Sequence, residues 1–150
     1  YNINKRRELM KILIISLVTF FIALNGFSKE VVVEMLNKRD DGEKMVFSED
    51  VVKVDVGDTI KWVATNKGHN VEFIAGPDGA SLPPKSGLNK EVSMTFDKPG
   101  VYLYICTPHK VMGMIGIVIV GNDTSNKDAI AGTKMIGRGK KKLASIMGQI

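Results

Sequence analysis

The chain has 150 residues, of which 44% are hydrophobic and 25% charged, a composition that indicates one globular domain and excludes a low-complexity polymer. The formal charge is +5, but the first 28 residues carry four bases and one acid, so the remainder has 17 bases against 15 acids, or +2. That near balance gives no support to nucleic-acid binding, and the single cysteine excludes an internal disulfide.

The N-terminal segment has the pattern of a secretory signal. Four basic residues precede an apolar run at residues 12–24, and small or polar residues follow it at 25–28. The run is shorter than the roughly 20 residues that a membrane-spanning helix needs. We therefore predict a signal over residues 1–28, a mature domain over residues 29–150 and export to the periplasm or the outside of the cell. An uncleaved membrane tether is the alternative.

Short apolar runs separated by turn signals fill the next part of the chain, and no helical pattern interrupts them. In the clearest run Ile60, Trp62 and Ala64 share one face, with Lys61 on the other. Seven or eight strands at such spacing predict an all-β sandwich or barrel. The runs are residues 31–36, 45–48, 51–54, 59–65, 69–73, 92–96, 101–105 and 115–120.

The composition changes after Gly121. Residues 125–131 and 140–149 have the pattern of two short helices, which we expect to dock on the sandwich. Ser125 is the expected N-cap of the first helix. Gly137 and Gly139 are expected to separate the two helices.

The residues that carry chemistry lie mainly between the last two predicted strands. The chain's only cysteine, Cys106, is followed by His109, one of two histidines, and then by Met112 and Met114; the other histidine, His69, lies far upstream. One thiolate, two imidazoles and a thioether are the ligands of a blue-copper electron-transfer site. Thioether is a poor ligand for zinc, which favours copper. Strand alternation favours Met114 as the axial ligand, with Met112 still open.

The surroundings of the predicted ligand loop suit electron transfer better than catalysis. Apolar strands flank the loop and keep water out. Pro108 has no N–H, so one possible hydrogen bond to the cysteine sulfur is missing. Both histidines are already used as ligands and no general base lies near Cys106, so we predict that the protein is not an enzyme. A copper carrier or chaperone without an electron-transfer role is the alternative.

Several segments together resemble the pseudoazurin group of the cupredoxin family, small periplasmic blue-copper proteins. The resemblance runs from about Val31 to the C-terminus. Its most specific segments are M-L-N-K at residues 35–38, V-G-D-T at 56–59, K-G-H-N-V-E at 67–72, C-T-P-H at 106–109 and M-G-M at 112–114.

The resemblance implies a cupredoxin-like Greek-key β-sandwich of about eight strands with two short C-terminal helices. It implies one copper ion, cycling between Cu(II) and Cu(I), with four ligands: His69, Cys106, His109 and Met114. It also implies that Asn37 and Thr107 brace the ligand loops and that the backbone N–H of Asn70 bonds the cysteine sulfur.

The resemblance further implies a monomeric electron carrier that serves periplasmic redox proteins, such as copper nitrite reductase or a c-type cytochrome. Docking in this group uses an apolar patch around the exposed histidine, ringed by lysines. The lysines available here for that ring are Lys38, Lys67, Lys85 and Lys110.

Overall fold

The computed structural model describes residues 28–150, together with residues 3 and 6; the predicted signal otherwise lies outside the described residues. Among the described residues, no helix combines the length and the hydropathy needed to cross a bilayer. The elements are β1 (Glu30–Lys38), β2 (Lys44–Phe47), β3 (Val51–Val54), β4 (Thr59–Val63), β5 (Glu72–Ala75), β6 (Val92–Thr95), β7 (Gly100–Ile105), the 3-10 helix η1 (Thr107–Met112), β8 (Ile115–Val120), α2 (Lys127–Ala131) and α3 (Gly137–Met147).

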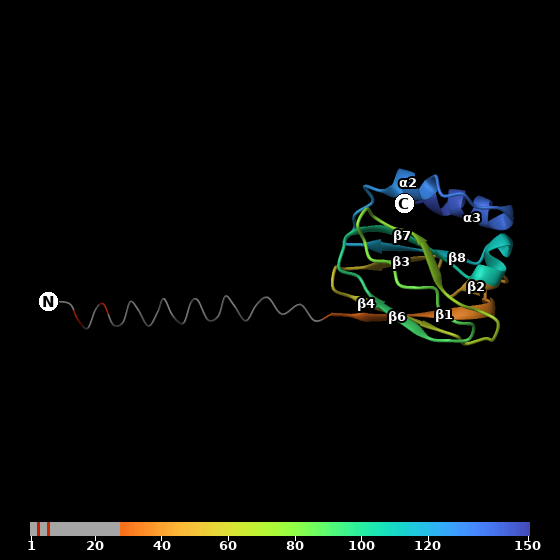
Figure 1. The fold of residues 1–150 in the computed structure, drawn as a ribbon, viewed down its shortest axis with the longest axis horizontal. Coiled ribbons are helices and arrows are strands. Elements are labelled where there is room, and N and C mark those ends of the chain that lie inside the picture. The colour runs from red at the N-terminus through yellow and green to blue at the C-terminus, as the bar shows by residue number, and fades with distance from the viewer. Residues whose placement is uncertain (1–2, 4–5, 7–27) are drawn as a thin grey trace.

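Two four-stranded sheets pack against each other, with strand orders β2-β1-β4-β6 and β3-β8-β7-β5 (Figure 1). The β1–β4 and β3–β8 pairs are parallel, and the other neighbouring strands are antiparallel. Non-consecutive neighbours show that the chain crosses from one sheet to the other, as in Greek-key sandwiches. The predicted all-β sandwich of about eight strands is confirmed.

The strands β7 and β8 are covered on both faces, and every residue in them is buried. Tyr102 and Tyr104 of β7 face the core between the sheets, whereas Leu103 and Ile105 face the outer cluster with α2 and α3. Side chains alternate across a strand, so Cys106, which follows Ile105, points with Tyr104 into the inter-sheet core. The alternation of side-chain direction along β7 therefore places the thiol of Cys106 in the core between the two sheets.

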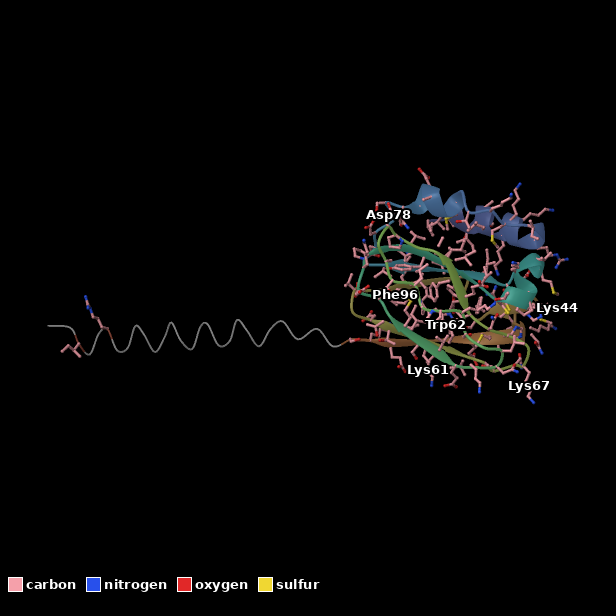
Figure 2. The ribbon with its side chains drawn as sticks, viewed as in Figure 1. Lys44, Lys61, Trp62, Lys67, Asp78 and Phe96 are labelled. Atoms are coloured by element: carbon pink, nitrogen blue, oxygen red, sulfur yellow. The ribbon has the colours of Figure 1, made fainter. Side chains whose placement is uncertain are left out.

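Aromatic side chains fill the centre of the inter-sheet core. Trp62 makes edge-to-face contacts with Phe73 and Tyr104, with ring centroids 5.4 and 5.2 Å apart. Figure 2 shows Trp62 and Phe96 between the two sheets. Ile60 and Trp62 are 0% exposed, which confirms the inward face predicted from their alternation. Each large apolar side chain buried in this way contributes roughly 1.5–3 kcal/mol.

The two C-terminal helices exist as predicted, but two details differ. The N-cap of α2 is Asn126 and not Ser125, whose N–H instead bonds the carboxylate of Asp123. Gly137 and Gly139 do not separate the helices: they lie in the first turn of α3, against the backbone of η1.

The register of β5 against β7 brings the upstream histidine to the ligand loop. Glu72, the first residue of β5, pairs antiparallel with Ile105, the last residue of β7. His69 precedes Glu72 by three residues and Cys106 follows Ile105, so both reach the same end of the sandwich. The predicted strand at 69–73 begins later than expected, because His69 O and Val71 O accept hydrogen bonds from the loop at residues 86–89.

Candidate metal centre

His69 is held in place by a neighbouring strand. Its side chain is 0% exposed, and its Nε2 lies 2.8 Å from Oδ1 of Asn37 in β1. Because an amide oxygen only accepts hydrogen bonds, Nε2 carries the proton and Nδ1 keeps its lone pair. That lone pair faces the thiol of Cys106.

The 3-10 helix η1 carries the second histidine back to the thiol. The backbone N–H of His109 donates to Cys106 O at 3.0 Å, and Gly113 ends the turn in a left-handed conformation with φ of 100°. The N–H of Met114 then donates to His109 O at 3.2 Å, and the N–H of Cys106 donates to Met114 O at 3.0 Å. These bonds close residues 106–114 into a compact loop around the sulfur.

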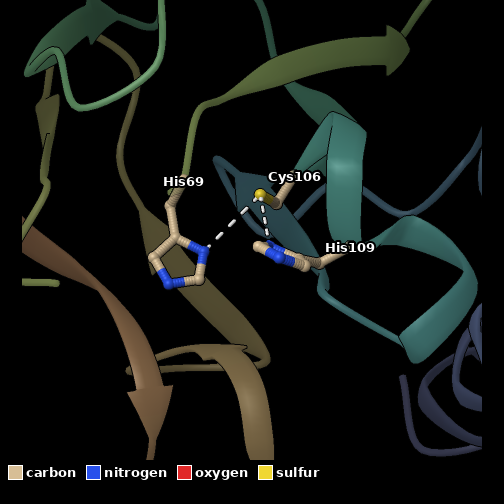
Figure 3. A group of neighbouring side chains, drawn as sticks. All are labelled: His69, Cys106 and His109. Carbon is tan, nitrogen blue, oxygen red and sulfur yellow. Dashed lines mark hydrogen bonds between the residues drawn. The ribbon is translucent and has the colours of Figure 1, made fainter. Parts of the chain in front are cut away.

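The three donor side chains converge on one point (Figure 3). The Sγ of Cys106 lies 3.7 Å from Nδ1 of His69 and 3.4 Å from Nδ1 of His109, and the three donor atoms lie within 4.8 Å of one another. A metal ion about 2.3 Å from a thiolate and about 2.0 Å from an imidazole nitrogen separates those two atoms by roughly 3.5–3.7 Å. The observed geometry fits three ligands of one ion.

Burial shifts the pKa values of two of the donor side chains in opposite directions. Burial, with repulsion from His109 as a smaller cause, lowers the pKa of His69 and keeps its ring neutral, as a ligand must be. Burial raises the pKa of the Cys106 thiol, and the backbone N–H groups of Asn70 and His109 oppose that rise. A cation among these atoms favours the thiolate, because coordination removes the proton from a thiol.

A network of polar side chains joins the His69 loop to the Cys106 loop. Asn70 accepts a hydrogen bond from the N–H of Thr107 at 2.8 Å and donates to the Thr107 hydroxyl at 3.0 Å. That hydroxyl donates to Glu72 at 2.7 Å, and Asn70 also donates to Ser86 O at 3.3 Å. The network ties the two ligand-bearing segments together, and Glu72 and Ser86 are members that the sequence analysis missed.

The two methionines have different surroundings. Met114 is 0% exposed and belongs to the same core cluster as Cys106. Met112 is 47% exposed and lines an outer hollow with Gly113 and Arg138. Burial thus favours Met114 as the additional donor.

The remaining predicted residues lie around the outside of the centre. Pro108 and the four predicted docking lysines are exposed, and His109 is half-buried. Lys110 is in η1, and Lys85 lines a hollow of about 360 Å³ with Leu88 and Pro108. Lys67 is at the same end of the sandwich as η1 in Figure 2. Lys38 follows Asn37 in β1.

The sequence profile of the copper binding proteins of the plastocyanin/azurin family matches residues 33–121. This chain belongs to that family. It is 40% identical over 129 residues to the pseudoazurin of Methylorubrum extorquens, covering 85% of this chain and 86% of the relative. It is 38% identical to the pseudoazurin of Paracoccus pantotrophus over 131 residues, covering 86% and 89%.

A solved structure supports the same relationship. The crystal structure of native pseudoazurin from Hyphomicrobium denitrificans matches with a TM-score of 0.75 and 42% identity, over 81% of this chain and 98% of that one. The resemblance to pseudoazurins and the cupredoxin fold are confirmed, and copper is the cofactor. Family membership makes this chain an electron carrier and not an enzyme.

Proposed function

We propose that this chain carries one electron at a time on a single copper ion held by His69, Cys106 and His109, with Met114 as a weak axial ligand. The observation that carries the proposal is the convergence of the chain's only thiol and both imidazoles, with sulfur-to-nitrogen distances of 3.7 and 3.4 Å. Such a donor set lets bound copper alternate between Cu(II) and Cu(I).

The residues around the ligands hold one arrangement for both oxidation states. Asn37 orients the His69 ring, and Asn70 joins its own loop to Thr107. Cys106 and His69 are 0% exposed, so water does not reach the sulfur or the inner imidazole. A dry site with pre-positioned ligands needs little rearrangement when an electron enters or leaves.

A copper chaperone is the alternative function, and the burial of the donors speaks against it. A protein that hands its metal to another needs ligands that the acceptor can reach. Here Cys106, His69 and Met114 are all 0% exposed, and only His109 is half-buried. An imidazole at the surface can pass an electron, but this site does not offer its sulfur ligands to an incoming protein.

Copper loading tests the electron-carrier proposal directly. Purified protein given Cu(II) is expected to turn intensely blue, bleach with a mild reductant and recover its colour on reoxidation. Zinc-loaded protein is the colourless control. A pale product, or colour that does not return, would favour a chaperone role.

The face around His109 is the proposed docking surface for a redox partner. Its apolar part includes Leu88, Val111 and Met112, which are 55%, 46% and 47% exposed. Around it we place the docking lysines Lys38, Lys67, Lys85 and Lys110. Arg138 and Lys141 of α3 line the hollow that contains Met112 and add positive charge beside this surface. Glu43 and Asp50 line the same hollow, and Asp50 is paired with Arg39 and Lys142.

Positive charge is unevenly distributed along the chain. Residues 122–150 hold six bases and two acids, whereas the described body as a whole is nearly balanced. A partner with an acidic surface around its redox centre fits this distribution, and we propose a periplasmic copper nitrite reductase or c-type cytochrome. Opposite charges steer such encounters and speed them by roughly tenfold or more at low salt.

Electron-transfer kinetics with these two partner classes test the docking surface. The reduced protein is expected to transfer electrons faster at low salt, and Lys141→Glu is expected to slow the reaction and weaken its salt dependence. Lys53→Glu is the matched control: Lys53 pairs with Ile119 near the far end of β8, away from the ligand loop. Equal effects of the two substitutions would contradict the proposed surface.

We also propose that residues 1–28 are removed on export, leaving a monomeric domain of residues 29–150 in the periplasm. One contact supports cleavage before Lys29: its backbone N–H donates to Asp58 Oδ1 at 2.8 Å. A new α-ammonium group at that position would meet a carboxylate. Mass spectrometry of the exported protein tests the boundary, and recovery of residues 1–28 would favour the membrane tether.

A further inference from the structure

The first turn of α3 lies directly against the backbone of the ligand loop. A Cβ atom built on Gly139 would lie 2.5 Å from the carbonyl oxygen of Lys110, and one on Gly137 would lie 2.7 Å from that of Val111. Both contacts are to main-chain atoms of η1, which cannot swing aside as a flexible side chain does. Only glycine allows the helix and the loop to approach so closely at these two positions.

Glycine is required at the two positions for different reasons. Gly137 has a φ of +61°, a left-handed conformation that residues with a side chain rarely adopt. The backbone conformation alone therefore explains why position 137 is a glycine. Gly139 is a buried helical residue without a positive φ. Alanine is the better helix former there. The lack of room for a Cβ atom beside Lys110 O therefore explains why position 139 is a glycine.

The carbonyl that Gly139 approaches belongs to the hydrogen-bonded ligand loop. Lys110 O accepts the N–H of Gly113 at 3.2 Å, and the next residue, Met114, donates its N–H to His109 O at 3.2 Å. Arg138 also lies close to this turn: a Cβ on Gly113 would lie 3.5 Å from Arg138 Cβ. A shift in the position of Lys110 O would therefore move both His109 and Met114, because these hydrogen bonds connect them.

We propose that Gly139, assisted by Gly137, is a positioning residue for the copper ligands: it seats α3 against the ligand loop and thereby sets where His109 and Met114 lie. The C-terminal helix is then part of the electron-transfer site although it contributes no ligand. This inference rests on the ligand assignment proposed above.

The substitution Gly139→Ala tests the inference against a matched control. Gly148→Ala changes a glycine at the other end of the same helix, where an added Cβ would meet only ordinary contacts of 3.5 and 3.6 Å. In Gly139→Ala we expect a changed intensity ratio of the thiolate-to-Cu(II) absorption bands, a shifted reduction potential and copper release that is roughly tenfold faster. Gly148→Ala is expected to match the unsubstituted protein in all three.

The metal-free protein gives a readout that does not depend on copper. The backbone amide NMR signals of Gly113 and Met114 are expected to shift in Gly139→Ala and to stay in place in Gly148→Ala. If Gly139→Ala does not fold, Gly137→Asn takes its place, because asparagine tolerates a left-handed backbone and its Cβ probes the contact with Val111 O.

The outcomes separate this inference from the proposed function. Unchanged absorption, potential and amide signals in the substituted protein would overturn the positioning role, even if the unsubstituted protein is blue and redox-active. An unsubstituted protein that stays colourless with copper would overturn the proposed function instead, whatever the amide signals show.

Discussion

At the scale of single residues, one hydrogen bond decides which nitrogen of His69 faces the thiol. Asn37 Oδ1 accepts from Nε2 at 2.8 Å, so the unprotonated Nδ1 points to Cys106 Sγ. Partners of this kind fix the tautomer and the orientation of a metal-binding imidazole. Asn37 is outside the donor set but determines the direction in which one donor points.

Removing this acceptor should weaken copper binding. Asn37→Leu leaves Nε2 without its partner, and we expect copper affinity to fall roughly 10- to 100-fold. Competition with a chelator of known affinity measures the change. Asn37→Asp keeps an acceptor oxygen and should retain most of the affinity; equal losses in both variants would show that the hydrogen bond is not the cause.

A second residue-scale prediction concerns acid stability. The backbone N–H groups of Lys29 and Asp55 donate to Asp58 and hold the pKa of that carboxylate below its ordinary value of 3.8. A lowered folded-state pKa means that the ionised group stabilises the fold above the ordinary pKa, and that this contribution disappears as the pH falls through the lowered value.

The substitution Asp58→Asn removes the titrating group and keeps an acceptor oxygen. We expect a lower Tm than that of the unsubstituted protein at neutral pH, with the difference shrinking as the pH falls below about 4. Thermal unfolding of the metal-free protein at a series of pH values measures this, because copper loss at low pH then does not contribute and the protonation of His69 affects both proteins alike. A Tm difference that is constant with pH would contradict the assignment.

At the scale of elements, the pairing of β7 with β8 makes room for a large side chain near the copper site. Tyr104 lies opposite Gly116, and a Cβ on Gly116 would lie 2.3 Å from the Tyr104 ring. The ring is fully buried, and burial raises the pKa of its hydroxyl. Within the described residues, no hydrogen bond of normal geometry reaches the hydroxyl of Tyr104 or Nε1 of Trp62, although the indole N–H is close enough to the phenol to oppose the rise in its pKa.

Removing the unpartnered hydroxyl should stabilise the sandwich. A buried polar group without a partner costs about 1–3 kcal/mol, so Tyr104→Phe is expected to raise the unfolding free energy by about 1 kcal/mol, seen as a higher Tm. Tyr102→Phe is the matched control and should lower Tm, because the Tyr102 hydroxyl donates to Lys98 O at 2.8 Å. A lower Tm in Tyr104→Phe would mean that the Trp62 N–H depends on the phenol oxygen.

At the scale of the whole molecule, the donor atoms are brought together by the sandwich itself. His69 lies in the β4–β5 connection, whereas Cys106 and Met114 lie at the two ends of the β7–β8 connection. Both connections are at one end of the sandwich, where Glu72 pairs with Ile105. Because β-ladders and the inter-sheet core maintain this end, the site is preformed and does not need the ion to assemble it.

The metal-free protein should therefore remain folded and gain stability on loading. A ligand that binds only the folded state adds about 2.7 kcal/mol when its free concentration is 100 times its Kd. Calorimetry with increasing copper should show a Tm that rises with concentration, while circular dichroism of the metal-free protein still shows the sheet signal. An unfolded metal-free chain at 25 °C would contradict a preformed site.

The sequence by itself determined the strand pattern and the identity of the donors. Alternation predicted the inward face of Trp62, and a single thiol close to one of only two histidines predicted a copper site, because thiolate, imidazole and thioether together select copper. Strand pairing is a long-range property, so the sequence did not reveal that Glu72 opposes Ile105 and thereby brings His69 to Cys106.

Only the tertiary structure decided what surrounds the centre. Gly137 and Gly139 looked like breaks between helices, but they are the positions where α3 meets the ligand loop at backbone distance. The packing of α3 also places Lys141 beside the same hollow as Met112, although the two residues are far apart in the sequence. Local propensity carries no information about which element lies across a contact, and that information comes only from the packed fold.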